Sequence, residues 1–189
     1  MPLLLRLVMY LSYLFLFSEL ILMLTKRSKN KSVKSRGDRG SLIILWLTIA
    51  ICLTLGFNLA KFGVWSPVNY FLGFLGLLLL FCGLIIRWTT IIQLKKEFTV
   101  DVAINQIHQL KTDGLYKIVR HPSYLGLLMI LTGFSLGMNT IISFIVVMLP
   151  VFLAIIYRIK VEENLLVKTF GEEYIKYASS TKKIIPFVY

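Results

Sequence analysis

The stretch SYLGLLMILTGFSLGMNTIISFIVVMLPVFLAIIY, Ser123 to Tyr157, contains two apolar runs separated by only two polar residues. The first run, Tyr124–Met138, corresponds to ~22 Å of helix at ~1.5 Å per residue, and the second is Ile141–Tyr157. Asn139 and Thr140 between them leave room only for a short turn. We therefore expect a tight antiparallel helical hairpin whose two ends return to the same side.

Three further apolar runs precede the hairpin, each close to the ~20 residues that span a bilayer core. They are Leu3–Leu24, Leu42–Ala60 and Asn69–Ile86. Of the 189 residues, 57% are hydrophobic and only 16% are charged, whereas about a quarter of the residues in a soluble domain are charged. These features predict an all-α integral membrane protein with five transmembrane helices, the last two forming the tight hairpin.

The basic residues predict the orientation of these helices. Seven Lys or Arg lie in residues 25–40, six in residues 87–123 and six in residues 158–189, so five crossings place 19 of the 21 on one side. By the positive-inside rule that side is the cytoplasm, which makes the protein multi-pass with its N-terminus outside and its C-terminus cytoplasmic. The net charge of +12 then reflects topology and attraction to membrane lipids rather than nucleic acid as a partner.

Charged residues stand at both cytoplasmic ends of the hairpin. Arg120, His121 and Pro122 precede its first helix, and Glu162 and Glu163 follow its second. Pro122 suits the first turn of a helix, and a residue before proline favours extended backbone. Because an antiparallel pair brings these ends together, we expect one cytoplasmic pocket at the membrane boundary.

Several spacings in the second half of the chain form a specific pattern. They are His108-x-Leu110-x-x-x-Gly114-x-Tyr116, Arg120-His121-Pro122-x-Tyr124-x-Gly126, Glu162-Glu163-x-x-Leu166-x-x-x-Phe170-Gly171-x-x-Tyr174-x-x-Tyr177 and Ile185-Pro186. This pattern resembles the isoprenylcysteine carboxyl methyltransferase family, to whose broader group the phospholipid methyltransferases belong. The resemblance covers roughly residues 87–187, and the five expected helices resemble the short prokaryotic members.

The resemblance implies a chain in two parts. Residues 1–86 would hold three N-terminal transmembrane helices, and residues 87–189 would form a cofactor-binding catalytic region with the transmembrane hairpin 123–159. The implied cofactor is S-adenosyl-L-methionine, and no metal ion is expected. By the family pattern its pocket would be cytoplasmic, in the C-terminal half, and lined by His108, Leu110, Gly114, Tyr116, Arg120, His121, Pro122, Tyr124, Glu162 and Glu163, with Arg120, Glu162 and Glu163 as the catalytic residues.

These residue types suit methyl transfer to a lipophilic small molecule or prenylated substrate that enters from the bilayer. Arg120 can form a two-pronged contact with a carboxylate, and an aromatic ring such as that of Tyr124 can face a sulfonium. A carboxylate acceptor is ionised at neutral pH and needs no general base. An amine or thiol would need His121 or a glutamate to remove a proton. The acceptor therefore stays open between an isoprenylcysteine-like carboxylate, a phospholipid amine and a small thiol.

Two other classes remain as alternatives. An NADPH-dependent membrane reductase of the sterol-reductase type has a related helical layout, but its cofactor would need more arginines than Arg120 and Arg158 near the hairpin mouth. A non-catalytic scaffold or transporter subunit would make the motif residues coincidental, and transporters usually carry ionisable residues near mid-membrane. The sequence has no glycine-rich turn between a strand and a helix, which excludes a Rossmann-type methyltransferase.

Three expectations concern residues outside the motifs. Glu19, near the end of the first apolar run, is expected to be an interfacial acid. Gly133 and Gly137 have the small-xxx-small spacing that permits close approach of membrane helices. The tail FGEEYIKYASSTKKIIPFVY, Phe170–Tyr189, is expected to form a short helix that covers the pocket.

Overall fold

The structure of the protein is a computed structural model that describes residues 3–25, 38–62, 70–94 and 110–186. This part of the chain is helical and contains one isolated bridge but no named strand. The helices, with the short 3₁₀ helix η1, are α1 (Leu3–Thr25), α2 (Asp38–Phe62), α3 (Tyr70–Leu94), η1 (Gly114–Lys117), α4 (Pro122–Gly137), α5 (Ile141–Phe170) and α6 (Glu172–Ser180).

Four of these helices, α1, α2, α3 and α5, are long and apolar enough to cross a membrane. Their apolar spans have mean hydropathies of 1.7 to 2.4, yet only 28% to 39% of each span is buried inside the chain. Phe71, Phe74 and Ile85 of α3, for example, point outward. Large apolar side chains on an outer surface are stable in lipid and costly in water, so the chain is a multi-pass integral membrane protein. The fifth expected span, α4, is a shorter apolar helix of 16 residues.

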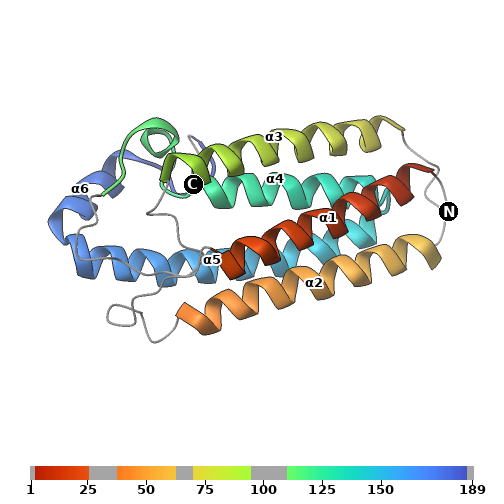
Figure 1. Cartoon of the computed structure of the whole chain (residues 1–189), viewed down its shortest axis with the longest axis horizontal. Coiled ribbons are helices and arrows are strands. Elements are labelled where there is room, and N and C mark those ends of the chain that lie inside the picture. The colour runs from red at the N-terminus through yellow and green to blue at the C-terminus, as the bar shows by residue number, and fades with distance from the viewer. Residues whose placement is uncertain (1–2, 26–37, 63–69, 95–109, 187–189) are drawn as a thin grey trace.

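Helices α4 and α5 form the expected hairpin, joined by Met138, Asn139 and Thr140. The side chain of Thr140 accepts a hydrogen bond from the backbone N–H of Ser143 and so caps α5. The two helices pack less extensively against each other than against α3 and α2, which lie along α4 and α5, respectively (Figure 1). The hairpin is therefore held in place mainly by its neighbours.

The interface between α3 and α4 is built on glycine. A Cβ atom on Gly83 would lie 2.7 Å from the carbonyl oxygen of Gly126, and one on Gly133 would lie 2.5 Å from that of Gly76. Backbone thus packs directly on backbone at two levels seven residues apart, as small residues permit between membrane helices. The expectation for Gly133 and Gly137 is met at this interface, since a Cβ atom on Gly76 would lie 2.7 Å from the carbonyl oxygen of Gly133 and 3.2 Å from the backbone nitrogen of Gly137. Gly137 also packs against Val8 of α1.

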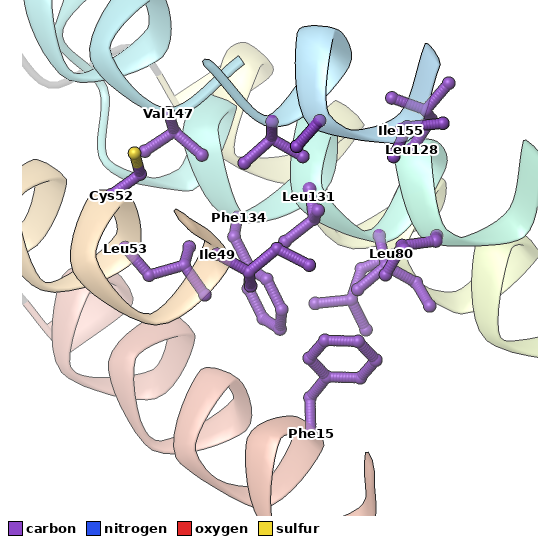
Figure 2. Close-up of a cluster of buried hydrophobic side chains, with 14 of the residues drawn as sticks. Phe15, Ile49, Cys52, Leu53, Leu80, Leu128, Leu131, Phe134, Val147 and Ile155 are labelled. Atoms are coloured by element: carbon purple, nitrogen blue, oxygen red, sulfur yellow. The ribbon is translucent and has the colours of Figure 1, made fainter. Parts of the chain in front are cut away.

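Side chains from all five long helices meet in one apolar core (Figure 2). The ring centroid of Phe15 in α1 lies 5.8 Å from that of Phe134 in α4 and 6.4 Å from that of Trp46 in α2. Ser143 of α5 adds a polar tie, because its hydroxyl donates to the carbonyl oxygen of Gly56 in α2 at 2.9 Å. This core fixes the relative positions of the helices that carry the site.

Two helices extend well beyond the apolar runs that predicted them. The third run ends at Ile86 whereas α3 ends at Leu94, and the last run ends at Tyr157 whereas α5 ends at Phe170. The runs predict the membrane-spanning parts, and helices of 25 and 30 residues extend past a ~30 Å hydrocarbon core. The expectation for Glu19 was wrong: it is 2% exposed and paired with Arg87 of α3.

Candidate active site

The motif residues from Arg120 to Tyr124 and from Glu162 to Tyr177 lie at one end of the helical bundle. Figure 1 shows α6 and the C-terminal part of α5 there, beside the segment that leads into α4. Pro122 occupies the first turn of α4, as its fixed φ and missing N–H favour. His121 is the N-cap with a φ of −124° and a ψ of 61°, so its φ has the value expected before proline but its ψ lies outside the predicted extended range.

The tail after α6 is tied to the segment before α4 by backbone pairing. Val119 and Lys182 form a parallel bridge. The N–H of Arg120 donates to the carbonyl oxygen of Lys182 at 2.8 Å, and that of His121 donates to Lys183 at 2.9 Å. The short helix expected in the tail is thus present as α6, and the residues after it lie directly beside the Arg-His-Pro motif.

Glu163 is surrounded by donors. Its Oε1 accepts from Nε of Arg120 at 3.0 Å and from the hydroxyl of Tyr174 at 3.3 Å, and it lies 3.4 Å from Nε2 of His121. Its Oε2 lies 3.2 Å from Nζ of Lys183. With 16% of its side chain exposed, this carboxylate joins α4, α6 and the tail. These contacts indicate that the carboxylate of Glu163 holds the parts of the site together.

Glu162 has fewer protein partners than Glu163. Its Oε2 accepts from the hydroxyl of Tyr124 at 3.0 Å, and its Oε1 lies 3.9 Å from Nδ1 of His121. Its side chain is 29% exposed, so acceptor capacity remains for a ligand. The buried His121 lies between the two carboxylates, and its Nε2 has no hydrogen bond of good geometry. Glu162 and His121 therefore have more hydrogen-bonding capacity left for a ligand than Glu163 has.

Arg120 uses two of its nitrogens to hold the protein together. In addition to the bond from Nε to Glu163, its Nη1 donates to the carbonyl oxygens of Ala178 and Thr181. Nη2 makes no hydrogen bond to the described part of the chain. A bidentate contact with a ligand would require Arg120 to break its hydrogen bonds to Ala178 and Thr181. In this geometry, only Nη2 is available to donate a hydrogen bond to a ligand.

The segment from Leu110 to Tyr116 is joined to α6 by a hydrogen bond between Tyr177 and Tyr116. Gly114 has a φ of +61°, the left-handed region that glycine adopts without strain, and opens η1. The hydroxyl of Tyr177 in α6 donates to the carbonyl oxygen of Tyr116 at 2.6 Å. Burial raises the pKa of Tyr177 to about 12, although Arg120 and a hydrogen bond with Thr181 act in the opposite direction. The hydroxyl is therefore a donor at neutral pH. Leu110 is half-buried, and His108 lies outside the described residues.

Four contributors were not among the predicted site residues: Arg158, Tyr174, Tyr177 and Lys183. The two tyrosines belong to the motif pattern, and Arg158 was expected near the hairpin mouth, but none of the three was assigned to the pocket. Arg158 is 1% exposed and donates to the hydroxyl of Tyr124 at 3.3 Å, which in turn donates to Glu162. Its spacing of four residues from Glu162 puts both on one face of a helix, a signal that was available in the sequence. Lys183 carried no such signal, because the turn after α6 brings it to Glu163.

An open pocket of about 310 Å³ adjoins this cluster. It is lined by Arg120 and the six residues from Ala178 to Lys183. Its lining is polar and basic, and its volume is at the small end of the range for ligand sites, ~300–1,000 Å³. The pocket and the carboxylate–histidine cluster share Arg120 and Lys183, so they form one continuous candidate site.

The fold and the site together define an all-helical, multi-pass membrane protein with a histidine and two carboxylates grouped at one end of the bundle. The chain belongs to the phospholipid methyltransferase family, whose model matches residues 71–173. This match and the relatives below confirm the resemblance inferred from the motifs, and they favour methyl transfer over the reductase alternative.

Several curated proteins are similar to part of the chain. Protein-S-isoprenylcysteine O-methyltransferase B of Arabidopsis thaliana is 36% identical over 115 residues, which cover 60% of this chain and 58% of that protein. Methanethiol S-methyltransferase of Pseudomonas deceptionensis is 33% identical over 111 residues, covering 55% of this chain and 41% of that protein. The similarity thus spans only about half of these relatives.

One solved structure has a similar fold over nearly the whole chain. It is the eukaryotic intramembrane Ras methyltransferase ICMT, with a TM-score of 0.65, 24% identity, and coverage of 96% of this chain and 65% of that one. The similarity in fold includes α1 and α2, for which the sequence resembled the family only in being hydrophobic.

Proposed function

We propose that the protein is a membrane-embedded methyltransferase that uses S-adenosyl-L-methionine to methylate the carboxylate of an isoprenylcysteine-like or other lipophilic acceptor. The observation that carries the proposal is the placement of His121 between Glu162 and Glu163, beside Arg120 and the tail, in a chain of this family. The isoprenylcysteine O-methyltransferases among its relatives support the choice of acceptor.

The polar groups of the site fit this cofactor. Glu162 has spare acceptor capacity for ribose hydroxyls or an amino group, and the buried Nε2 of His121 has an unmet hydrogen-bonding capacity. Lys182, Lys183 and Arg120 line the adjoining pocket and can attract a carboxylate. The ring of Tyr124 lies 5.8 Å from that of His121 and can contribute an aromatic face to a sulfonium.

The protein's own contribution to the reaction is alignment and exclusion of water. The bound cofactor supplies an activated methyl group, so most of the acceleration can come from holding acceptor oxygen, methyl and leaving sulfur in line. A carboxylate acceptor is already ionised at neutral pH and needs no proton removed. Arg120, Glu162 and Glu163, the proposed catalytic residues, therefore act by binding and orientation.

We further propose five crossings, with the N-terminus outside and the site on the cytoplasmic side. The basic segments support this orientation, because 19 of 21 Lys and Arg then fall on the cytoplasmic side. Helix α5 supports it too: at ~45 Å it is longer than the hydrocarbon core, so Glu162 and Glu163 can stand above the membrane while an acceptor approaches from lipid.

A second acceptor class has specific support. One relative is a methanethiol S-methyltransferase, and the family model is that of phospholipid methyltransferases. A thiol or an amine would need a base, and His121, 3.4 Å from a carboxylate oxygen, is the candidate.

The test is calorimetric titration of the detergent-purified protein with S-adenosylhomocysteine and, separately, with NADPH. We expect saturable binding of the nucleoside that is lost in Arg120→Ala, followed by methylation of prenylcysteine analogues in preference to phospholipid amines or small thiols. Binding of NADPH alone, or of neither compound, would refute the proposal. Methylation of a thiol with no turnover of prenylcysteine analogues would keep the cofactor and overturn the acceptor.

A further inference from the structure

An ion pair buried between α1 and α3 lies outside the cluster described above. Nε and Nη2 of Arg87 donate to the two carboxylate oxygens of Glu19 at 2.5 and 2.6 Å. Arg87 is 6% exposed and Glu19 is 2% exposed, and both lie within apolar membrane-spanning segments. Ionisable residues in such positions are costly and usually serve a function.

The pair is a poor way to gain stability alone. Desolvating two charges offsets much of their attraction, and well-packed apolar residues of similar size would hold two helices as firmly. Unlike an apolar contact, an arginine–carboxylate pair fixes the orientation of both side chains, because the two parallel hydrogen bonds hold them in one plane. Its third donor, Nη1, then points at a defined place.

That place is the first turn of α4. Nη1 of Arg87 donates to the hydroxyl of Ser123 at 3.0 Å and to its carbonyl oxygen at 3.3 Å. Ser123 lies between Pro122 and Tyr124, in the same turn as His121 and Tyr124, which contact Glu162 and Glu163. The charge pair thus reaches the site through a single residue.

A second buried arginine holds the same turn from the other side. Arg158 of α5 donates to the hydroxyl of Tyr124 at 3.3 Å and to that of Ser41 in α2 at 2.6 Å. The start of α4 is therefore held between α1 and α3 on one flank and α2 and α5 on the other. Glu19 and Ser41 belong to helices outside the matched residues 71–173.

We propose that Glu19 and Arg87 are positioning residues for the site: the pair fixes the first turn of α4 through Ser123 and thereby sets the places of His121 and Tyr124 opposite the two glutamates. The proposal rests on the proposed function and assigns α1 a part in it. The pair contacts neither carboxylate of the site and acts only through Ser123, whose hydroxyl and carbonyl oxygen accept from Arg87.

The experiment compares variants that break this relay with one that weakens the fold elsewhere. Ser123→Ala keeps the ion pair and removes the hydroxyl that Arg87 contacts. Arg87→Lys keeps the charge opposite Glu19 but loses the planar fork. Phe15→Leu is the control, because it removes buried volume from α1 against Phe134 without a contact to α4's first turn.

Two readouts are needed. Hydrogen exchange in detergent, read on peptides covering residues 119–126 and 141–150, requires no activity. We expect Ser123→Ala and Arg87→Lys to increase exchange in 119–126 and leave 141–150 near the wild type. We also expect the dissociation constant for S-adenosylhomocysteine to rise about tenfold, since a charge-assisted hydrogen bond to the site is lost. Phe15→Leu should lower the melting temperature without either effect.

Equal exchange in both peptides, or wild-type nucleoside affinity in variants that melt earlier, would show that the pair only joins helices and would overturn the proposal. If the wild-type protein binds no S-adenosylhomocysteine, the proposed function fails independently. Hydrogen exchange then decides alone: a local increase in 119–126 supports the positioning role, and a uniform increase overturns it.

Discussion

Replacing Glu163 by glutamine should cost stability, whereas the same change at Glu162 should cost ligand binding. The carboxylate of Glu163 contacts Arg120, Tyr174 and Lys183 at 3.0 to 3.3 Å, with 16% of its side chain exposed. Glutamine keeps one neutral oxygen and turns an NH₂ group toward one of these donors.

The size of the effect follows from this environment. Charge-assisted hydrogen bonds contribute ~1.5–3 kcal/mol each, and breaking a fully buried pair costs ~3–5 kcal/mol. Because Glu163 and Lys183 are partly exposed, we expect Glu163→Gln to lower the free energy of unfolding by ~2–4 kcal/mol. For a chain of this length that is a fall in melting temperature of roughly 8 °C.

Glu162 makes one hydrogen bond, from Tyr124, which a glutamine oxygen can still accept. We expect Glu162→Gln to melt within ~2 °C of the wild type while its affinity for S-adenosylhomocysteine falls at least tenfold, roughly the loss of one hydrogen bond from a charged acceptor.

The assay is thermal unfolding in detergent followed by tryptophan fluorescence, together with nucleoside titration. Glu172→Gln supplies the same change of charge at an exposed position of α6. A Glu163→Gln protein that melts with the wild type and Glu172→Gln, or a Glu162→Gln protein that binds the nucleoside normally, would refute the division of roles between the two carboxylates.

Two further predictions concern packing and the tail. Gly83→Ala would place a Cβ atom 2.7 Å from backbone oxygen in α4, so it should force α3 and α4 apart and cost about 1–3 kcal/mol of stability; thermal unfolding checks this, with Gly40→Ala, which meets no atom within 4 Å, as the control. Arg120→Ala removes the donors to two carbonyl oxygens of residues 178–183, so trypsin should cleave that segment faster in this variant than in Lys168→Ala, and equal cleavage rates would show that Arg120 does not hold the tail.

Apolar run length and the positions of proline and turn residues were enough to predict that α1 to α5 exist. The starts of α4 and α5 and the hairpin between them followed from Pro122 and from the two polar residues after Met138. The ends of α3 and α5 could not be found this way, because a helix that leaves the membrane continues through polar residues without a break. Composition marks the boundary of the bilayer rather than that of the helix.

Sequence spacing also predicted which motif residues lie close together, because positions at two helix ends meet whenever those helices are antiparallel. The different environments of Glu162 and Glu163, however, were visible only in the tertiary structure. Glu162 and Glu163 are adjacent and chemically identical in the sequence, yet α6 and the tail cover one and leave the other partly open. Likewise, nothing local pairs Glu19 with Arg87, 68 residues apart. Such pairings depend on which helix faces pack together, and that choice is made by the glycine contacts and the shared core, so only the folded chain decides them.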